Sequence, residues 1–178
     1  MSTTVRPDNL RAALAAKLAA AMSQWVDLRE AEQPHVTPHL NPREIVGSFL
    51  QYASSVYPIA DTFGRAQAGD LQFDAWYRQW METLGDVDRA LWKQLRDERA
   101  RQEHGQGAAL IEREISVSRD PSVTAHESTP GAHAEVRKKL VRFAASPDRA
   151  ASDLCDEYLR LARRFANDFV RDYARFLP

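Results

Sequence analysis

An arginine and a histidine near the middle of the chain have residue types that suit phosphate chemistry. Arg99 and His104 are separated by four residues in the segment LRDERARQEHG, which spans 95–105. Histidine titrates near neutral pH and moves protons, whereas the arginine guanidinium binds phosphate through a planar fork of N–H donors. The pair therefore suits RNA cleavage, which needs proton transfer and a cation beside the developing charge.

The Arg-x4-His motif lies late in a long predicted helix, and in this it resembles the HEPN superfamily. That superfamily comprises helical bundles, mostly of about four or five helices and often dimeric, and is named for nucleotide binding in higher eukaryotes and prokaryotes. Its active members are metal-independent RNA endonucleases with an Arg-x4-6-His motif. The resemblance implies that Arg99 stabilises the phosphate in the transition state, while His104 transfers a proton or activates the ribose 2′-hydroxyl. It also implies RNA and a second copy of the chain as partners.

Helix geometry sets a condition on this pair. On an ideal helix, successive residues turn by about 100°, so Arg99 and His104 lie about 140° apart. They converge only if the helix ends near Glu103 or if a second protomer completes the site. A structural role is also open to His104, because a histidine near a helix C-terminus interacts favourably with the helix dipole. A catalytic pair should meet in an accessible cleft, whereas a structural pair should point apart or bind local groups.

A cluster of basic residues forms the second candidate site. Arg137, Lys138, Lys139 and Arg142 lie close together in the chain. Such cations can contact RNA phosphates, although runs of this kind more often form a solvated helix face. Further basic residues follow on the next predicted helix, at Arg160, Arg163 and Arg164.

The overall composition excludes several classes of protein. The chain has 24 lysines and arginines against 25 aspartates and glutamates, a net charge of −1. This balance gives no overall attraction to nucleic acid or to a membrane surface. No apolar run approaches the roughly 20 residues of a membrane span, and the first residues lack a signal-peptide pattern. We therefore expect a cytoplasmic protein without a membrane partner.

Patterns for metals and cofactors are weak. His35 and His39 have a metal-like spacing, but Pro34 and Pro38 argue against a helix there. The chain has no glycine-rich phosphate loop and no CxxC pair. We therefore expect no metal ion and no other cofactor.

The apolar spacing predicts an all-α fold in one domain that spans 1–178. We expect about five helices in an up-and-down bundle, with a short strand or an irregular segment near 108–118 and an exposed loop at about 116–131. Asn41 and Pro42 mark a helix beginning, and Pro58 should kink the same helix. The predicted helices run from about 9 to 32, 41 to 69, 71 to 104, 132 to 145, and from 147 almost to the C-terminus.

Two functional interpretations remain open. The first is an HEPN-like protein that acts as a metal-independent RNA endonuclease of the toxin or phage-defence type. The second is a non-catalytic helical bundle that binds a protein partner or self-associates, with the exposed loop as a binding surface.

Overall fold

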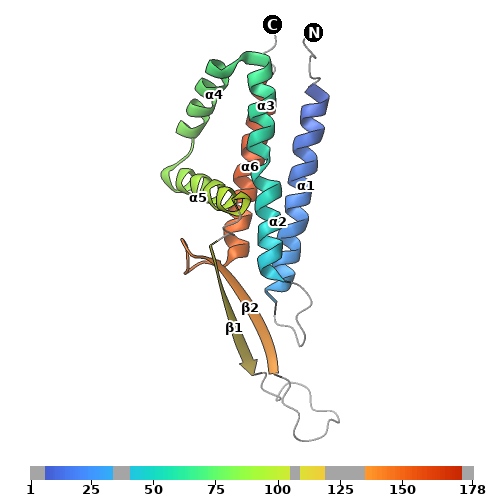
Figure 1. The fold of residues 1–178 in the computed structure, drawn as a ribbon, viewed down its shortest axis with the longest axis vertical. Coiled ribbons are helices and arrows are strands. Elements are labelled where there is room, and N and C mark those ends of the chain that lie inside the picture. The colour runs from blue at the N-terminus through green and yellow to red at the C-terminus, as the bar shows by residue number, and fades with distance from the viewer. Residues whose placement is uncertain (1–6, 34–40, 105–108, 119–134, 174–178) are drawn as a thin grey trace, which may run out of the picture.

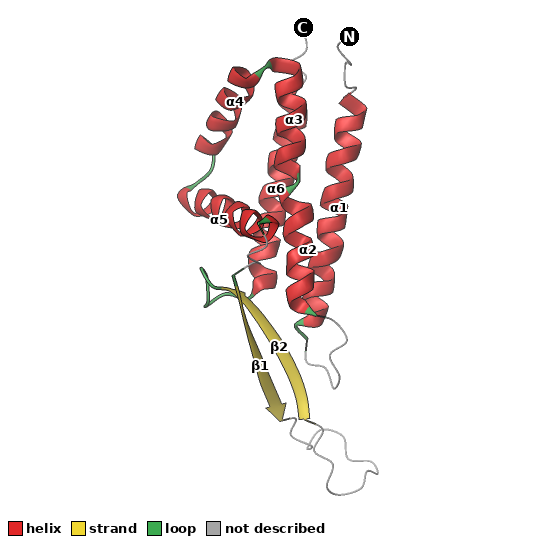
Figure 2. Cartoon of the chain, viewed as in Figure 1, coloured by secondary structure: helices red, strands yellow, loops and turns green. Residues whose placement is uncertain are grey.

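A computed structural model of the chain describes residues 7–33, 41–104, 109–118 and 135–173. These residues form an all-α fold with one two-stranded antiparallel sheet (Figures 1 and 2). The strand expected near 108–118 is present. In chain order the elements are α1 Pro7–Ala31, α2 Pro42–Ser54, α3 Val56–Ala68, α4 Asp70–Glu82, α5 Asp86–Glu103, β1 Leu110–Ser118, β2 Glu135–Phe143 and α6 Ala151–Tyr173.

The helix α6 is central to the bundle because it contacts α1, α2, α3 and α5. It begins at Ala151 rather than near Pro147. Its buried face has the three- and four-residue spacing that the sequence indicates, with Leu154, Tyr158, Leu161, Phe165, Phe169 and Tyr173. In the described part of the chain, none of the helices is long and apolar enough to cross a membrane.

A break separates α2 from α3, where the sequence predicts one kinked helix. The helix α2 ends at Ser54 and α3 begins at Val56. Pro58 has no N–H to donate to the carbonyl of Ser54, four residues earlier, and its ring crowds the same carbonyl. The helix is therefore interrupted at Ser55, and the structure has two helices where the sequence predicts a single kinked one.

The predicted helix 71–104 is wrong in one respect, because the structure divides it into α4 and α5. Carbonyls in the last turn of α4 bind side chains: Thr83 Oγ1 donates to Trp80 O at 2.7 Å, and Arg89 Nε donates to Met81 O at 3.2 Å. Gly85 follows, a residue type that commonly ends a helix, and Asp86 is the acidic first residue of α5. The chain turns there, and α5 runs back toward α2 (Figure 1).

The predicted helix 132–145 is also wrong, because residues 135–143 form β2. This strand pairs with β1 from Leu110 opposite Phe143 to Ser118 opposite Glu135. Val141 and Phe143 are both buried, which is the two-residue period of a strand. The buried Glu98 accepts a hydrogen bond from the Ala109 N–H at 3.0 Å and fixes the base of the hairpin.

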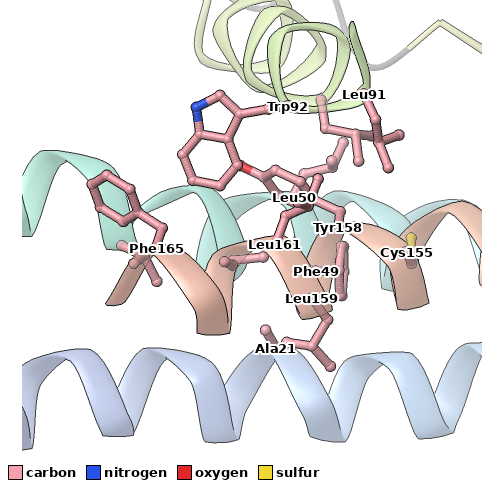
Figure 3. Close-up of a cluster of buried hydrophobic side chains, with 14 of the residues drawn as sticks. Ala21, Phe49, Leu50, Leu91, Trp92, Cys155, Tyr158, Leu159, Leu161 and Phe165 are labelled. Carbon is pink, nitrogen blue, oxygen red and sulfur yellow. The ribbon is translucent and has the colours of Figure 1, made fainter. Parts of the chain in front are cut away.

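Aromatic rings connect α6 to the α4–α5 arm, and Figure 3 shows Phe165 and Tyr158 of α6 beside Trp92 of α5. Phe165 of α6 lies 4.9 Å from Trp80 and 5.2 Å from Trp92, measured between ring centroids. Its ring is also 5.5 Å from that of Trp76 and 6.0 Å from that of Tyr57. Edge-to-face and tilted pairs at these distances stabilise the core beyond simple burial.

Two glycines allow α4 to lie against α3. Gly69 has a φ of 82°, in the left-handed region that glycine adopts without strain, and it joins the two helices. Gly64 is buried, and a Cβ atom there would lie 2.3 Å from Cδ2 of Phe73. The α3–α4 contact therefore requires a residue without a side chain at position 64.

We expect Gly64→Ala to lower the free energy of unfolding by about 1–3 kcal/mol, because the methyl group must displace the Phe73 ring. Gly85→Ala is the matched control, since a Cβ there meets nothing within 4 Å. That change should be neutral or stabilising by up to about 1 kcal/mol. Urea denaturation of the three proteins measures both effects, and equal midpoints for Gly64→Ala and wild type would contradict the close packing.

Candidate functional site

The predicted catalytic pair lies at the end of α5. The helix ends at Glu103, so His104 is the first residue beyond it. This is the helix end that the sequence requires if Arg99 and His104 are to converge within one chain. His104 is exposed, and its N–H still donates to Ala100 O at 3.1 Å. Arg99 is half-buried and donates from Nη1 to Ser54 O at 3.2 Å. The arginine is thus directed at α2, and His104 is not among the residues that line the cavity beside it.

The Ser54 carbonyl explains why Arg99 lies where it does. Pro58 cannot donate to this oxygen, so the carbonyl needs another partner. A buried carbonyl without a hydrogen bond costs about 1–3 kcal/mol. The Arg99 guanidinium therefore replaces the N–H that the proline lacks, which is a structural role.

Arg96, one turn earlier on α5, is a site residue that the sequence analysis missed. Its guanidinium carbon lies 3.9 Å from the centroid of the Tyr57 ring, and its Nη1 donates to the Tyr77 hydroxyl at 2.7 Å. Trp92 Nε1 donates to the same hydroxyl at 3.0 Å. The recurrence of basic residues at 89, 93, 96 and 99, in steps of three and four, is the signal that places them along one side of a helix.

Two cavities meet at Arg96. The smaller has a volume of about 190 Å³ and lies between the α2/α3 break and α5, where Tyr57, Arg96 and Arg99 line it. The larger is a groove of about 600 Å³ between α4 and α5, lined by Tyr77, Lys93 and Arg96 among others. Arg96 belongs to both walls, so a ligand at this guanidinium can extend into either space.

The predicted RNA-binding cluster lies on β2 and not on a helix. Arg137, Lys138 and Lys139 stand opposite Ser116, Ile115 and Glu114 in the strand register. Their side chains lie outside the described part of the structure. Arg142 is half-buried, and its Nη1 donates to Pro147 O at 2.5 Å, so it fastens the turn after the strand.

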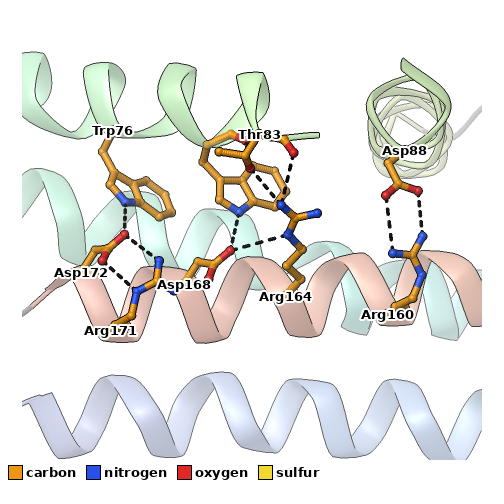
Figure 4. A network of polar contacts seen from close by, with 9 residues as sticks. Trp76, Thr83, Asp88, Arg160, Arg164, Asp168, Arg171 and Asp172 are labelled. Carbon is orange, nitrogen blue, oxygen red and sulfur yellow. Dashed lines mark hydrogen bonds and ion pairs between the residues drawn. The ribbon is translucent and has the colours of Figure 1, made fainter. Parts of the chain in front are cut away.

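Two arginines of α6, Arg160 and Arg164, hold the α4–α5 arm (Figure 4). Arg160 binds both carboxylate oxygens of Asp88, at 2.7 and 3.4 Å. Arg164 donates to Thr83 Oγ1 at 3.1 Å. Because these guanidiniums bind protein groups, the sequence-based expectation that they contact phosphates finds no support in their geometry.

A second groove lies between α4 and α6, with a volume of about 680 Å³. The indole nitrogens on its wall bind carboxylates: Trp76 Nε1 donates to Asp172 at 3.2 Å, and Trp80 Nε1 donates to Asp168 at 3.1 Å. Arg171 Nη1 also lies 2.9 Å from Asp168. The charged groups of this groove therefore satisfy one another.

Among the described residues we find neither a cluster of metal ligands nor an accessible thiol. No group of three or more His, Cys, Asp or Glu side chains there could hold a metal ion. His35 and His39 lie outside the described residues. Cys155 is fully buried, and burial raises the pKa of its thiol well above the usual value. Burial and the raised pKa both disfavour the thiolate form, which is the form that acts as a nucleophile.

We expect Arg99→Met to lower the free energy of unfolding by about 1–2 kcal/mol, because the Ser54 carbonyl loses its partner. The cost should be smaller in a Pro58→Ala background, where the new N–H of residue 58 can bind that carbonyl. Urea denaturation of the two single variants and the double variant completes a double-mutant cycle. An equal cost in both backgrounds would contradict the assigned role.

Comparison with known proteins adds no relative to this picture. No protein-family model matches the chain, and no curated protein or solved structure does so either.

Proposed function

We propose that the chain is a non-catalytic helical interaction module that self-associates through its β-hairpin. The observation that carries the proposal is the sheet itself, which has two strands of nine residues each and extends away from the helices (Figure 2). A two-stranded sheet is marginally stable alone in water. Its outer edges present backbone N–H and C=O groups that can pair with another strand.

The charges of the two strands favour β1 as the pairing edge. The β2 strand contains Arg137, Lys138, Lys139 and Arg142 against Glu135, a net charge of 4 − 1 = +3. Basic residues on an edge strand oppose further pairing. The β1 strand contains Glu112 and Glu114 against Arg113, a net charge of 1 − 2 = −1, and four apolar residues. A second copy of β1, related by a two-fold axis, is the occupant that this edge fits best.

The position of Arg99 supports a role without catalysis. A group that stabilises a transition state needs donors aimed at the charge that develops during the reaction. The Arg99 Nη1 donor is aimed at the Ser54 carbonyl.

We expect the wild-type protein to form dimers whose fraction falls on dilution, as measured by size-exclusion chromatography with light scattering. Ile111→Lys places a charge on an exposed residue of β1 and should raise the dimer dissociation constant about tenfold or more. Leu71→Lys is the matched control, because Leu71 is an exposed apolar residue on α4. A wild-type monomer at all concentrations, or equal effects of both changes, would contradict association through β1.

A second candidate is the metal-independent RNA endonuclease of the HEPN type, because α5 ends at Glu103 and leaves His104 exposed beyond the helix. A partner protomer would have to supply the complementary group.

The catalytic candidate predicts RNA cleavage by the purified protein in the presence of EDTA. His104→Ala should abolish that cleavage without loss of stability, since His104 is exposed. Arg99→Lys keeps a positive charge and Arg99→Met removes it, so the two variants together separate a loss of catalysis from a loss of folding. Circular dichroism checks that each variant is folded. The interaction-module proposal expects no cleavage by the folded wild type, and cleavage lost in His104→Ala would overturn it.

A further inference from the structure

The cavity between the α2/α3 break and α5 has an unusual charge composition. Six described residues line it, and none of them is acidic: Ser54, Tyr57, Pro58, Arg96, Arg99 and Ala100. Its volume of about 190 Å³ is several times the roughly 30 Å³ that one water molecule occupies in the liquid. Two guanidiniums thus face a space that can hold an anion with several oxygen atoms.

Arg96 is held in place but keeps free donors. A guanidinium has five N–H donors, and Arg96 uses one of them on the Tyr77 hydroxyl. Stacking on Tyr57 fixes the plane of the group. No carboxylate among the described residues lies within ion-pair distance of Arg96. Its remaining N–H groups are therefore oriented in advance and available to a ligand.

Three other arginines of the described residues differ from Arg96 because they bind carboxylates. Arg65 binds three aspartates, at 2.8, 3.1 and 2.7 Å. Arg149 lies 2.6 Å from Glu157, and Arg160 lies 2.7 Å from Asp88. These three half-buried or exposed arginines thus bind carboxylates, whereas Arg96, which is also half-buried, has no carboxylate partner among the described residues.

The groove between α4 and α5 extends the positive surface. Its wall includes Arg78 and the exposed Lys93, one turn before Arg96. Of its two acidic residues, Asp74 is bound to Arg65 at 2.7 Å. Met81 provides an apolar contact on the same wall. The groove can therefore accept the organic part of a ligand whose anionic group lies at Arg96.

One more polar atom lies within the electrostatic influence of Arg96 and Arg99. The hydroxyl of Tyr158 is buried and has no hydrogen-bond partner among the described residues. Burial raises the pKa of Tyr158, while the positive charges of Arg96 and Arg99 oppose that effect. The hydroxyl and the two guanidiniums therefore share one neighbourhood.

We propose that Arg96 binds the phosphate group of a small phosphate ester at the mouth of this cavity, with Arg99 adding positive charge and the ester body lying in the α4–α5 groove beside Lys93 and Met81. Phosphate matches the guanidinium fork, which binds two oxygen atoms in one plane. Lys93 acts as a second point charge at the entrance.

The test is isothermal titration calorimetry of the full chain at low salt, with phenyl phosphate, inorganic phosphate, phenol and a short RNA as probes. Phenyl phosphate should bind more tightly than inorganic phosphate, and phenol should not bind. Arg96→Gln should weaken binding of phenyl phosphate about tenfold or more, as expected for the loss of charge-assisted hydrogen bonds. Higher salt should weaken binding as well.

Two further variants keep the test decisive. Arg171→Gln changes an exposed arginine on α6 and should leave binding unchanged. Lys93→Gln should weaken binding about threefold, and it serves if Arg96→Gln fails to fold, because Lys93 is exposed. Equal affinities of folded Arg96→Gln and Arg171→Gln, or a folded wild type that binds neither phosphate probe, would overturn the proposal. If inorganic phosphate or a short RNA binds and phenyl phosphate does not, the assignment to a small phosphate ester is overturned.

Discussion

The arrangement of the helices depends on the burial of Phe165. Its ring lies within about 6 Å of aromatic rings from three other helices: Tyr57 of α3, Trp76 and Trp80 of α4, and Trp92 of α5. These ring contacts hold the α4–α5 arm against α6. The indole N–H groups of Trp76 and Trp80 then bind carboxylates of α6, which satisfies the polar end of each ring (Figure 4).

The position of α5 has a consequence for the polar groups at the α2/α3 break. Pro58 opens the helix there, and the docked α5 brings Arg96 and Arg99 to the open carbonyl and to the Tyr57 ring. A proline that only weakened the helix would be a cost of about 3 kcal/mol. Here the break also creates a cavity whose walls contain two guanidiniums. The helix break and the candidate anion site therefore have the same origin, which is Pro58.

The sequence predicts the parts of this fold that depend on local signals. The α6 face follows from apolar spacing, and α2 begins at Pro42 with Asn41 as its cap, whose side chain accepts from the Arg43 N–H. It does not predict β2, because Val136, Leu140 and Phe143 fit a helical spacing until pairing with β1 selects the strand. The division of α4 from α5 is indicated only by Gly85 and Asp86, because the apolar spacing of Leu84, Val87 and Leu91 continues across them and favours one helix. The sequence does not identify Arg96 as a site residue, because its contacts are with Tyr57 and Tyr77, which lie far away in the chain.

The contrast between Arg99 and Arg96 separates a structural cation from a binding cation. Both lie on α5, three residues apart, and both line the same cavity. Arg99 donates to a backbone carbonyl that would otherwise be unsatisfied, so a ligand would have to compete with that bond. Arg96 is oriented by an aromatic ring and by a hydroxyl, neither of which neutralises its charge. A preorganised cation of this kind favours tight binding of an anion, because little side-chain freedom is lost when the ligand arrives.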